Sequence, residues 1–102
     1  MNKFNLDCYE LLKQIPQGRV TTYKIIAEKL GGRYSRAYRA VGQIVGANPN
    51  APQVPCHRVV ASNGAISGYA FGIDKKIALL ASENVEIENG KVKNFKKIIY
   101  EF

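Results

Sequence analysis

The stretch that decides the fold is Thr22–Pro49, TYKIIAEKLGGRYSRAYRAVGQIVGANP. Thr22 can cap a helix over residues 23–30, and Gly31-Gly32 would end it. A second helix is expected from Ser35 to a stop at Asn48-Pro49, because the residue before a proline disfavours helix. Its apolar side carries Ala40, Val41, Ile44 and Val45. Two short helices joined by a glycine-containing turn predict a helix-turn-helix.

An amphipathic helix is expected upstream of this motif. Asp7 and Glu10 have the spacing of a capping box, which predicts a helix start. Apolar residues recur at helical intervals in this region, namely Phe4, Cys8, Leu11, Leu12 and Ile15. The Pro-Gln-Gly segment 16–18 breaks the run, and residues 19–21 after it are β-prone. Because Cys8 lies on the apolar stripe, we expect a buried structural thiol there.

Two Asn-Gly turns indicate β structure downstream. Residues 58–61 and 65–68 flank Asn63-Gly64, and this pattern predicts a hairpin that would form a wing. A further helix is expected from a cap at Asp74 to about Ser82. Its inward-facing residues would be Ile77, Leu80 and Ala81. Asn89-Gly90 joins two more short β-like stretches.

These elements together predict an α+β fold that is mainly helical, a winged-helix-like helix-turn-helix domain with a short β-hairpin wing. We expect one domain over residues 1–102, because a chain of 102 residues has the size of one compact unit. Apolar residues make up 46% of the chain, which is enough for an ordinary core.

The composition argues against several classes of protein. Cys8, Cys56 and the single histidine, His57, are too few for a Cys/His zinc site or for a disulfide-stapled secreted domain. The N-terminus has acidic residues where a signal peptide would be apolar, and no stretch approaches the roughly 18 apolar residues of a membrane span. We therefore expect a soluble protein of the reducing cytoplasm, without a metal and without membrane contact.

The charge balance favours a nucleic-acid partner. The formal net charge is +7 and the sequence pI is near 9.6, but solubility charge alone would explain these totals equally well. Arg33, Arg36 and Arg39 fall three apart at the start of the expected helix, near its positive end, where phosphates bind well. Gly42 and Gly46 in that helix cost roughly 1 kcal/mol each relative to alanine. Pressing the helix into a DNA groove would explain them, and close helix packing is the alternative.

The segment Pro55–Val59, PCHRV, lies between this helix and the expected hairpin. A loop fixed by proline can hold a thiol out of the core, and a thiolate is a strong nucleophile when a base or a positive charge lies close. Neighbours in sequence need not touch through their side chains, so a packed cysteine beside a capping histidine is the alternative.

A longer series of motifs resembles one family. RAVG at 39–42, Asn48-Pro49, PCHRVV at 55–60, Gly68-Tyr69 and Glu83 follow in this order and at these intervals. They look like the DNA-binding and catalytic domain of the O6-alkylguanine-DNA alkyltransferases. The resemblance spans about residues 4–85 and leaves only the C-terminal end of the chain outside it.

The resemblance implies a set of catalytic residues. Cys56 would be the alkyl acceptor, His57 would take its proton through a water, and Glu83 would orient the histidine. Tyr23 would rotate the 3′ phosphate of the nucleotide outward and donate a hydrogen bond to the guanine leaving group. Asn48 would brace the active-site turn.

It also implies residues that contact DNA and the flipped base. Arg39 matches an arginine finger, which enters the base stack and fills the gap left by the lesion. The expected DNA contacts are Tyr23, Arg33, Ser35, Arg36, Arg39, Gly42 and Arg58. The expected pocket residues are Pro55, Val59, Tyr69 and Ala70. Of these, Tyr69 lies on the loop that closes over the base.

The implied reaction is DNA repair by irreversible transfer of an alkyl group from O6 of guanine in double-stranded DNA to the protein. Because O6 lies inside the base stack, the nucleotide must be flipped out at a cost of a few kcal/mol. The product thioether has no easy hydrolysis route, so each molecule acts once, without a cofactor. We expect a monomer that binds weakly through the minor groove, with steep salt dependence.

Two departures from the family pattern bear on substrate range and rate. Many members carry an additional N-terminal domain, in some with a structural zinc, whereas this chain is expected to start at the catalytic domain. Ala70-Phe71-Gly72 stands where the family often has Ser-Gly-Gly after the loop tyrosine. A hydroxyl that could bond the guanine edge is therefore missing, and Phe71 adds bulk.

Two other functions stay open. An alkyltransferase-like lesion-binding protein would use the same fold to flag alkylated guanine for excision, but such proteins commonly have tryptophan at the position of Cys56. A winged-helix transcription regulator would explain the charge and the helix-turn-helix. It gives no role to Cys56-His57, however, and usually needs a dimer interface.

Overall fold

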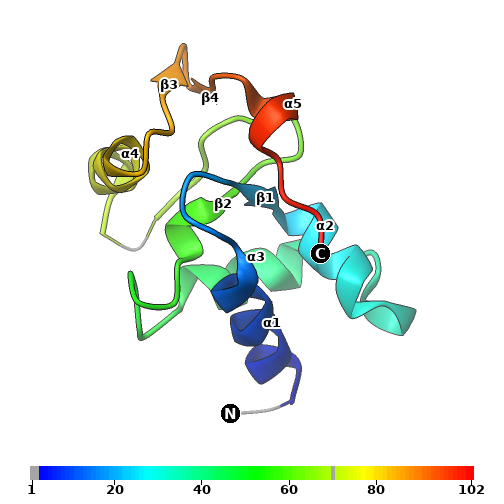
Figure 1. The fold of residues 1–102 in the computed structure, drawn as a ribbon. Coiled ribbons are helices and arrows are strands. Elements are labelled where there is room, and N and C mark those ends of the chain that lie inside the picture. The colour runs from blue at the N-terminus through cyan, green and yellow to red at the C-terminus, as the bar shows by residue number, and fades with distance from the viewer. Residues whose placement is uncertain (1–2, 70) are drawn as a thin grey trace.

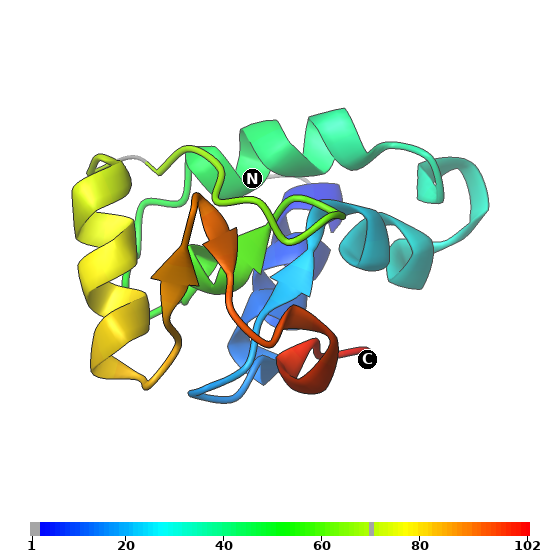
Figure 2. The same ribbon diagram turned by 90° about the horizontal axis from the view of Figure 1, so that it is seen from above.

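The computed structural model describes residues 3–69 and 71–102, with every side chain in them except that of Arg33. Helices α1 (Lys3–Gln14), α2 (Tyr23–Leu30) and α3 (Tyr38–Gly46) pack against one another. The second group of elements comprises α4 (Ile73–Ser82), β3 (Ile87–Glu88), β4 (Lys91–Val92) and α5 (Phe95–Ile98). A short parallel strand pair lies between the two groups (Figures 1 and 2). The predicted α+β, mainly helical class is confirmed.

Helix α2 has the predicted bounds because both of its ends are fixed locally. The Thr22 side chain accepts a hydrogen bond from the backbone N–H of Ile25 at 3.1 Å, which satisfies one donor of the first turn. Gly31 ends the helix with φ 72°, a backbone conformation that other residues rarely adopt.

The predicted start of the next helix at Ser35 is wrong, and α3 begins only at Tyr38. The positive φ of Gly31 and Gly32 turns the chain into a short 3-10 helix, η1 (Gly32–Tyr34), which Ser35 ends. The segment between η1 and α3 is a turn, so Arg36 precedes α3 and only Arg39 lies in its first turn. The expectation that three arginines share one helical face is therefore also wrong. The predicted stop before Asn48-Pro49 is confirmed.

The N-terminal helix forms as predicted, but Asp7 does not cap it. Helix α1 already includes Lys3, whose Nζ lies 3.3 Å from the Asp7 carboxylate one turn later. The carboxylate thus serves an i,i+4 ion pair instead of a cap. Cys8 and Leu12 are fully buried, as the apolar stripe predicts.

The hairpin predicted over residues 58–68 is wrong. Strand β2 (Val59–Val60) pairs in parallel with β1 (Thr21–Thr22), while Ala65 bridges Lys91 instead. The Asn63-Gly64 turn does form, with the Ala61 N–H donating to the Ala65 carbonyl at 3.0 Å. Both side chains of β2 are fully buried, and pairing with β1 lets each face of the strand meet a different core.

The hairpin of the fold lies further along the chain. Strands β3 and β4 pair antiparallel, with Glu88 opposite Lys91, across the Asn89-Gly90 turn that the sequence predicts. The C-terminal end then returns to β1, where the Val20 N–H donates to the Ile98 carbonyl at 3.1 Å and the Tyr100 N–H to the Val20 carbonyl at 2.6 Å. The last residues thus extend the parallel strand pair.

Helix α4 keeps its predicted C-terminal end but not its predicted cap. Gly72 occupies the N-cap position, and Asp74 is exposed in the first turn, where its charge suits the positive helix end. Leu80 is buried as predicted, whereas Ala81 is exposed. The residue buried one turn before Leu80 is Lys76, which the hydrophobic pattern does not identify.

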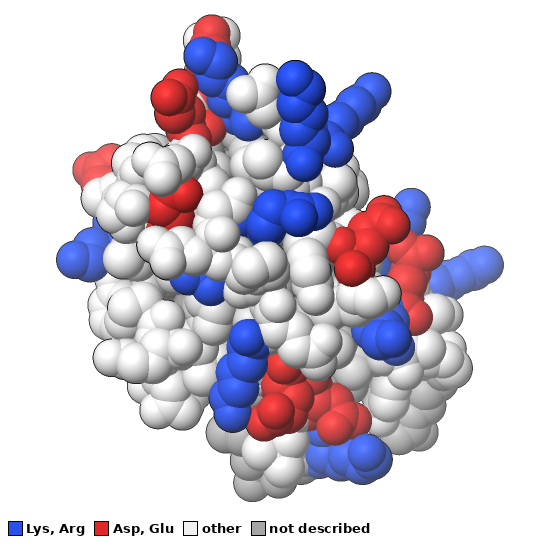
Figure 3. All heavy atoms as spheres, in the orientation of Figure 1, with Lys and Arg blue, Asp and Glu red and all other residues white. Residues whose placement is uncertain are grey.

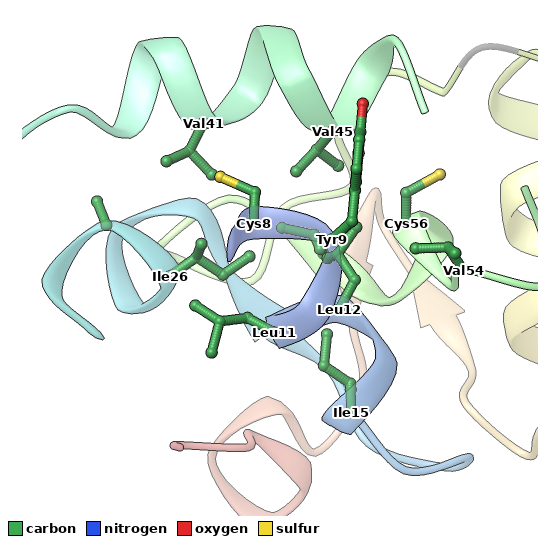
Figure 4. Close-up of a cluster of buried hydrophobic side chains, with 12 residues drawn as sticks. Cys8, Tyr9, Leu11, Leu12, Ile15, Ile26, Val41, Val45, Val54 and Cys56 are labelled. Carbon is green, nitrogen blue, oxygen red and sulfur yellow. The ribbon is translucent and has the colours of Figure 1, made fainter. Parts of the chain in front are cut away.

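Two apolar clusters fill the space on either side of the strand pair. The first joins α1, α2 and α3 and includes Val59 of β2 (Figure 4). The second includes Val60 of β2 and is completed by Val20, Leu80, Val85 and Val92. Among the described residues, no helix is both long and apolar enough to cross a membrane.

The turn at Gly64 provides a test of the contact between this loop and α5. A methyl group added at Gly64 would lie 2.9 Å from Cγ of Phe95, and φ there is +84°. Gly64→Ala is therefore expected to lower the free energy of unfolding by about 2–4 kcal/mol in urea denaturation.

Gly90→Ala is the matched control, because φ is +75° there but nothing lies within 4 Å of the added methyl. It is expected to cost about 1 kcal/mol of backbone strain alone. Equal losses for the two variants would contradict the packing of Gly64 against Phe95.

Candidate active site around Cys56

Cys56 opens the short 3-10 helix η2 (Cys56–Arg58), directly before β2. Its backbone N–H donates to the Val54 carbonyl at 2.8 Å, and the Arg58 N–H donates to the Pro55 carbonyl at 3.1 Å. In Figure 4 the sulfur of Cys56 lies at the edge of the first cluster and points away from it, whereas the sulfur of Cys8 points toward Val41 within it. The Cys56 thiol can therefore meet a group outside the cluster, whereas the Cys8 thiol faces other side chains of the cluster.

A pocket of about 190 Å³ lies against Cys56. It is lined by Tyr23, Gly42, Val45, Gly46, Cys56, Gly68 and Tyr69. Gly42, Val45 and Gly46 form the α3 wall of this space, and the two glycines add no side chain to it. Gly42 faces the Tyr23 ring, 3.8 Å from the position of an added methyl, and Gly46 has nothing within 4 Å. Neither glycine meets a neighbouring backbone, so the packing alternative is not supported.

The Cys56 thiol is subject to opposing influences. Burial raises its pKa, while the neighbouring Asn48 side chain and the Lys76 ammonium act to lower it. Asn48 is held in place because it donates to the Val54 carbonyl at 2.7 Å and accepts from the Asn50 N–H at 3.0 Å. The predicted bracing of this turn by Asn48 thus has a clear hydrogen-bond basis.

Cys8 is the buried structural thiol that the sequence predicts. It is fully buried, and burial followed by the nearby Asp7 charge raises its pKa to about 11. A thiol with this pKa stays protonated at neutral pH, which disfavours a role as nucleophile.

His57, the residue after Cys56, forms a buried pair with Glu83. Nε2 of His57 lies 2.9 Å from Oε2 of Glu83, across 26 residues of sequence. Burial lowers the pKa of His57, so the ring is neutral and Nε2–H donates to the carboxylate. Nδ1, the other ring nitrogen, is buried without a hydrogen-bond partner among the described residues. In this tautomer Nδ1 is the free base.

Arg58 completes this cluster and does not have the position of a DNA contact. Its Nε and Nη2 donate to the two oxygens of Glu83 at 2.8 and 2.7 Å, and its Nη1 donates to the Ile15 carbonyl at 2.8 Å. All of its guanidinium contacts thus point into the protein, contrary to the sequence expectation. Burial raises the pKa of Glu83, but the hydrogen bonds from Arg58 and His57 outweigh it and leave this pKa below its usual value.

Lys76 is the site residue that sequence reasoning missed. It is fully buried, and its Nζ donates to the Val59 carbonyl at 2.8 Å, to Ser67 Oγ at 3.0 Å and to the Gly68 carbonyl at 3.3 Å. Burial lowers its pKa to about 8. One signal was available, because Lys76, Leu80 and Glu83 recur at helical spacing on one face of α4.

Of the predicted pocket residues that the structure describes, one lines the pocket and two do not. Tyr69 lines the pocket, and its hydroxyl is buried without a partner among the described residues. Pro55 and Val59 are buried and are not among the residues that line this pocket. Ala70 lies outside the described residues.

Of the predicted DNA-contacting residues, Arg39 and Gly42 lie in α3, and Ser35 and Arg36 lie just before it. Tyr23 begins α2. Arg36 and Arg39 are exposed, and Ser35 is half-buried in the turn that follows η1. The side chain of Arg33 lies outside the described part of the chain. Figure 3 shows the face seen in Figure 1, with β3, β4 and α5 at its top, and basic and acidic side chains are interspersed on it. That face has no uniformly basic surface.

Comparison with known proteins finds a family match over the part of the chain that carries Cys56, His57 and Glu83. Residues 3–85 match the family model described as 6-O-methylguanine DNA methyltransferase, DNA binding domain. A bifunctional methyltransferase/endonuclease of Picrophilus torridus is 43% identical over 82% of this chain and 28% of its own length. A methylated-DNA–protein-cysteine methyltransferase of Candida glabrata is 46% identical over 81% of this chain and 39% of its own. The chain thus spans less than half the length of these two curated relatives.

Solved structures confirm the winged-helix-like fold. Mycobacterium tuberculosis OGT in complex with DNA superposes with a TM-score of 0.77 at 41% identity, over 81% of this chain and 50% of that one. S. pombe Atl1 in complex with damaged DNA containing O6-carboxymethylguanine superposes with a TM-score of 0.84 at 30% identity. This second match covers 100% of this chain and 98% of that one, so it includes the C-terminal segment.

The carboxylate of Glu83 can be tested as the centre of the buried cluster. Glu83→Gln keeps the shape but leaves Arg58 without its anion, so we expect a loss of about 2–4 kcal/mol in the free energy of unfolding at neutral pH. Because the pKa of Glu83 is lower in the folded state, its contribution is present above the ordinary value of 4.5 and is lost as the pH falls below it. The difference between the two proteins should therefore shrink on acidification.

Urea denaturation at neutral and acidic pH measures this difference. Glu10→Gln is the control, since Glu10 pairs with Lys13 at 3.0 Å on the surface and should contribute less than about 1 kcal/mol. A loss for Glu83→Gln that is as small as that of the control, or that grows on acidification, would contradict the assignment.

Proposed function

Because this chain belongs to the family of the 6-O-methylguanine DNA methyltransferase DNA-binding domain, we propose that it repairs DNA by accepting an alkyl group from O6 of guanine onto Cys56. The observation that carries the proposal is the position of this thiol. It borders a pocket of about 190 Å³, with the His57–Glu83 pair next to it in the fold. A merely structural cysteine, such as Cys8, has neither feature.

The transfer is a displacement at the alkyl carbon. The Cys56 sulfur forms a bond to that carbon, the bond from carbon to O6 breaks, and its electron pair stays with the guanine. The thiol proton passes through a water to Nδ1 of His57, and the Glu83 carboxylate stabilises the imidazolium that results. The thioether is stable, so each molecule reacts once and needs no cofactor.

Tyr23 and Tyr69 would receive the flipped base, since both line the pocket beside Cys56. Arg39 is exposed in the first turn of α3 and is the side chain that we propose enters the base stack. The exposed Arg36 next to it would contact phosphate. We propose that the partner is double-stranded DNA approached from the minor groove, and that one protein molecule binds as a monomer.

We also propose that the described residues act as one domain. The two apolar clusters share the strand pair β1–β2, and residues 98–100 hydrogen-bond to the chain at Arg19–Thr21. The elements that carry Cys56 and Glu83 therefore fold around common strands.

A lesion-binding protein that does not accept the alkyl group is the second candidate. The observation that favours it is the Atl1 match, which extends over the whole of this chain, whereas the family model ends at residue 85. The presence of Cys56 beside His57 and Glu83 favours transfer. The two functions differ in whether the protein gains mass.

Intact-protein mass spectrometry after incubation with a duplex containing one O6-methylguanine distinguishes them. We expect a gain of one methyl group that saturates at one per molecule, that is lost in Cys56→Ser and that persists in Cys8→Ser. Binding of the lesion duplex by wild type without a gain in mass would establish the second candidate.

The role of Arg39 is tested by the affinity for the lesion duplex. Arg39→Ala is expected to weaken this binding about tenfold, because the gap in the base stack is no longer filled, and to weaken binding of undamaged duplex much less. Lys13→Ala, a distant change of the same charge, should reduce both affinities equally and slightly. Fluorescence anisotropy at fixed salt measures them, and equal losses on the two duplexes for Arg39→Ala would refute a role in lesion recognition.

A further inference from the structure

The proposed reaction assigns no role to Lys76, although burying its charge is costly. The ammonium donates three hydrogen bonds, to Ser67 Oγ and to the carbonyls of Val59 and Gly68, so all of its donors are used within the protein. It also lies close enough to Cys56 for each group to affect the pKa of the other. A buried and fully hydrogen-bonded cation beside the nucleophile calls for an explanation in terms of the site.

Ser67 connects Lys76 to Tyr23. Its Oγ lies 3.0 Å from Lys76 Nζ and 2.6 Å from the Tyr23 hydroxyl. An ammonium can only donate, so Ser67 accepts from Lys76. The hydroxyl proton of Ser67 then needs an acceptor of its own. Among the described residues, the Tyr23 oxygen lies within hydrogen-bond distance of it. The arrangement that gives every one of these donors a partner within the protein therefore has Ser67 donating and Tyr23 accepting.

This direction decides what Tyr23 can do. A phenol whose oxygen already accepts from Ser67 keeps its own proton for another partner. Tyr23 lines the same pocket as Cys56, so the proton is available to a group held there. The Lys76 charge strengthens the series, because each hydrogen bond polarises the next in a site of low dielectric.

We propose that Lys76 and Ser67 are positioning residues that orient the Tyr23 hydroxyl as a hydrogen-bond donor into the Cys56 pocket. The proposal rests on the proposed function, in which the guanine retains the electron pair of the broken bond. Tyr23 donates to this base as negative charge develops on it, and Lys76 supports the donation through Ser67. No covalent change occurs at either positioning residue.

The first experiment measures methyl transfer in a single turnover. Ser67→Ala is expected to lower the rate constant about fivefold to tenfold, while the dissociation constant for the lesion duplex changes less than about twofold. Ser67→Thr retains the hydroxyl and should restore the rate. Ser82→Ala is the matched control, because Ser82 is exposed and its hydroxyl donates to the Leu79 carbonyl of its own helix.

A double-mutant cycle with Tyr23→Phe tests whether Ser67 acts through Tyr23. Once the phenol is gone, Ser67→Ala should have no further effect on the rate. Additive losses, an unchanged rate in Ser67→Ala, or failure of Ser67→Thr to restore it would each overturn the proposal. Thermal melting of every variant separates these outcomes from loss of fold.

A second measurement needs neither DNA nor transfer. The pKa of Tyr23 is read by NMR of isotope-labelled tyrosine rings, with Tyr23→Phe assigning the signal. Donation from Ser67 stabilises the phenolate, so Ser67→Ala should raise the pKa of Tyr23. A lower pKa would mean that Tyr23 donates to Ser67 and would overturn the proposal. If wild type fails to transfer methyl yet this pKa rises, the proposed function fails and the coupling of Ser67 to Tyr23 stands.

Discussion

The Glu83 carboxylate is the point at which separate parts of the chain become one site. It lies where α4 ends, and it accepts from His57 and from both arms of the Arg58 guanidinium. Arg58 also donates to the carbonyl of Ile15, which follows α1 and belongs to the first apolar cluster. The hydrogen bonds of Glu83 and Arg58 therefore connect the end of α4 to that cluster. An anion in this position requires cationic or polar partners, and those partners fix the conformation of η2. The orientation of Cys56, at the start of η2, follows from this constraint.

Two opposing effects act on the thiol of Cys56, the candidate nucleophile. Exclusion of water strengthens the hydrogen bonds and charges around the thiol, but burial also raises the pKa of Cys56 and so disfavours the thiolate. Asn48 and Lys76 counter that effect from different elements, and His57 stays neutral and able to take a proton. The site therefore depends on groups that are far apart in sequence and whose effects combine only in the folded chain.

Local signals were sufficient where the physical cause is itself local. Thr22 and Gly31 determine the ends of α2 through one hydrogen bond and one backbone angle, and the Asn89-Gly90 turn sets the hairpin in the same way. The predicted hairpin over residues 58–68 was wrong because its first strand is compatible with more than one pairing partner. Val59-Val60 fits any strand partner, and the parallel pairing with β1 is settled by burial on both faces.

The sequence by itself determined the existence of the helical segments and the candidate nucleophile, because the Thr22 cap, apolar periodicity and the PCHRV motif are properties of neighbouring residues. The tertiary structure alone decided that Arg58 faces Glu83 and not the solvent, and that Lys76 is buried beside Cys56. Arginine and lysine are normally placed at the surface by their charge. Only the position of a distant carboxylate, or of carbonyls presented by another loop, can reverse that preference, and no local pattern encodes those positions.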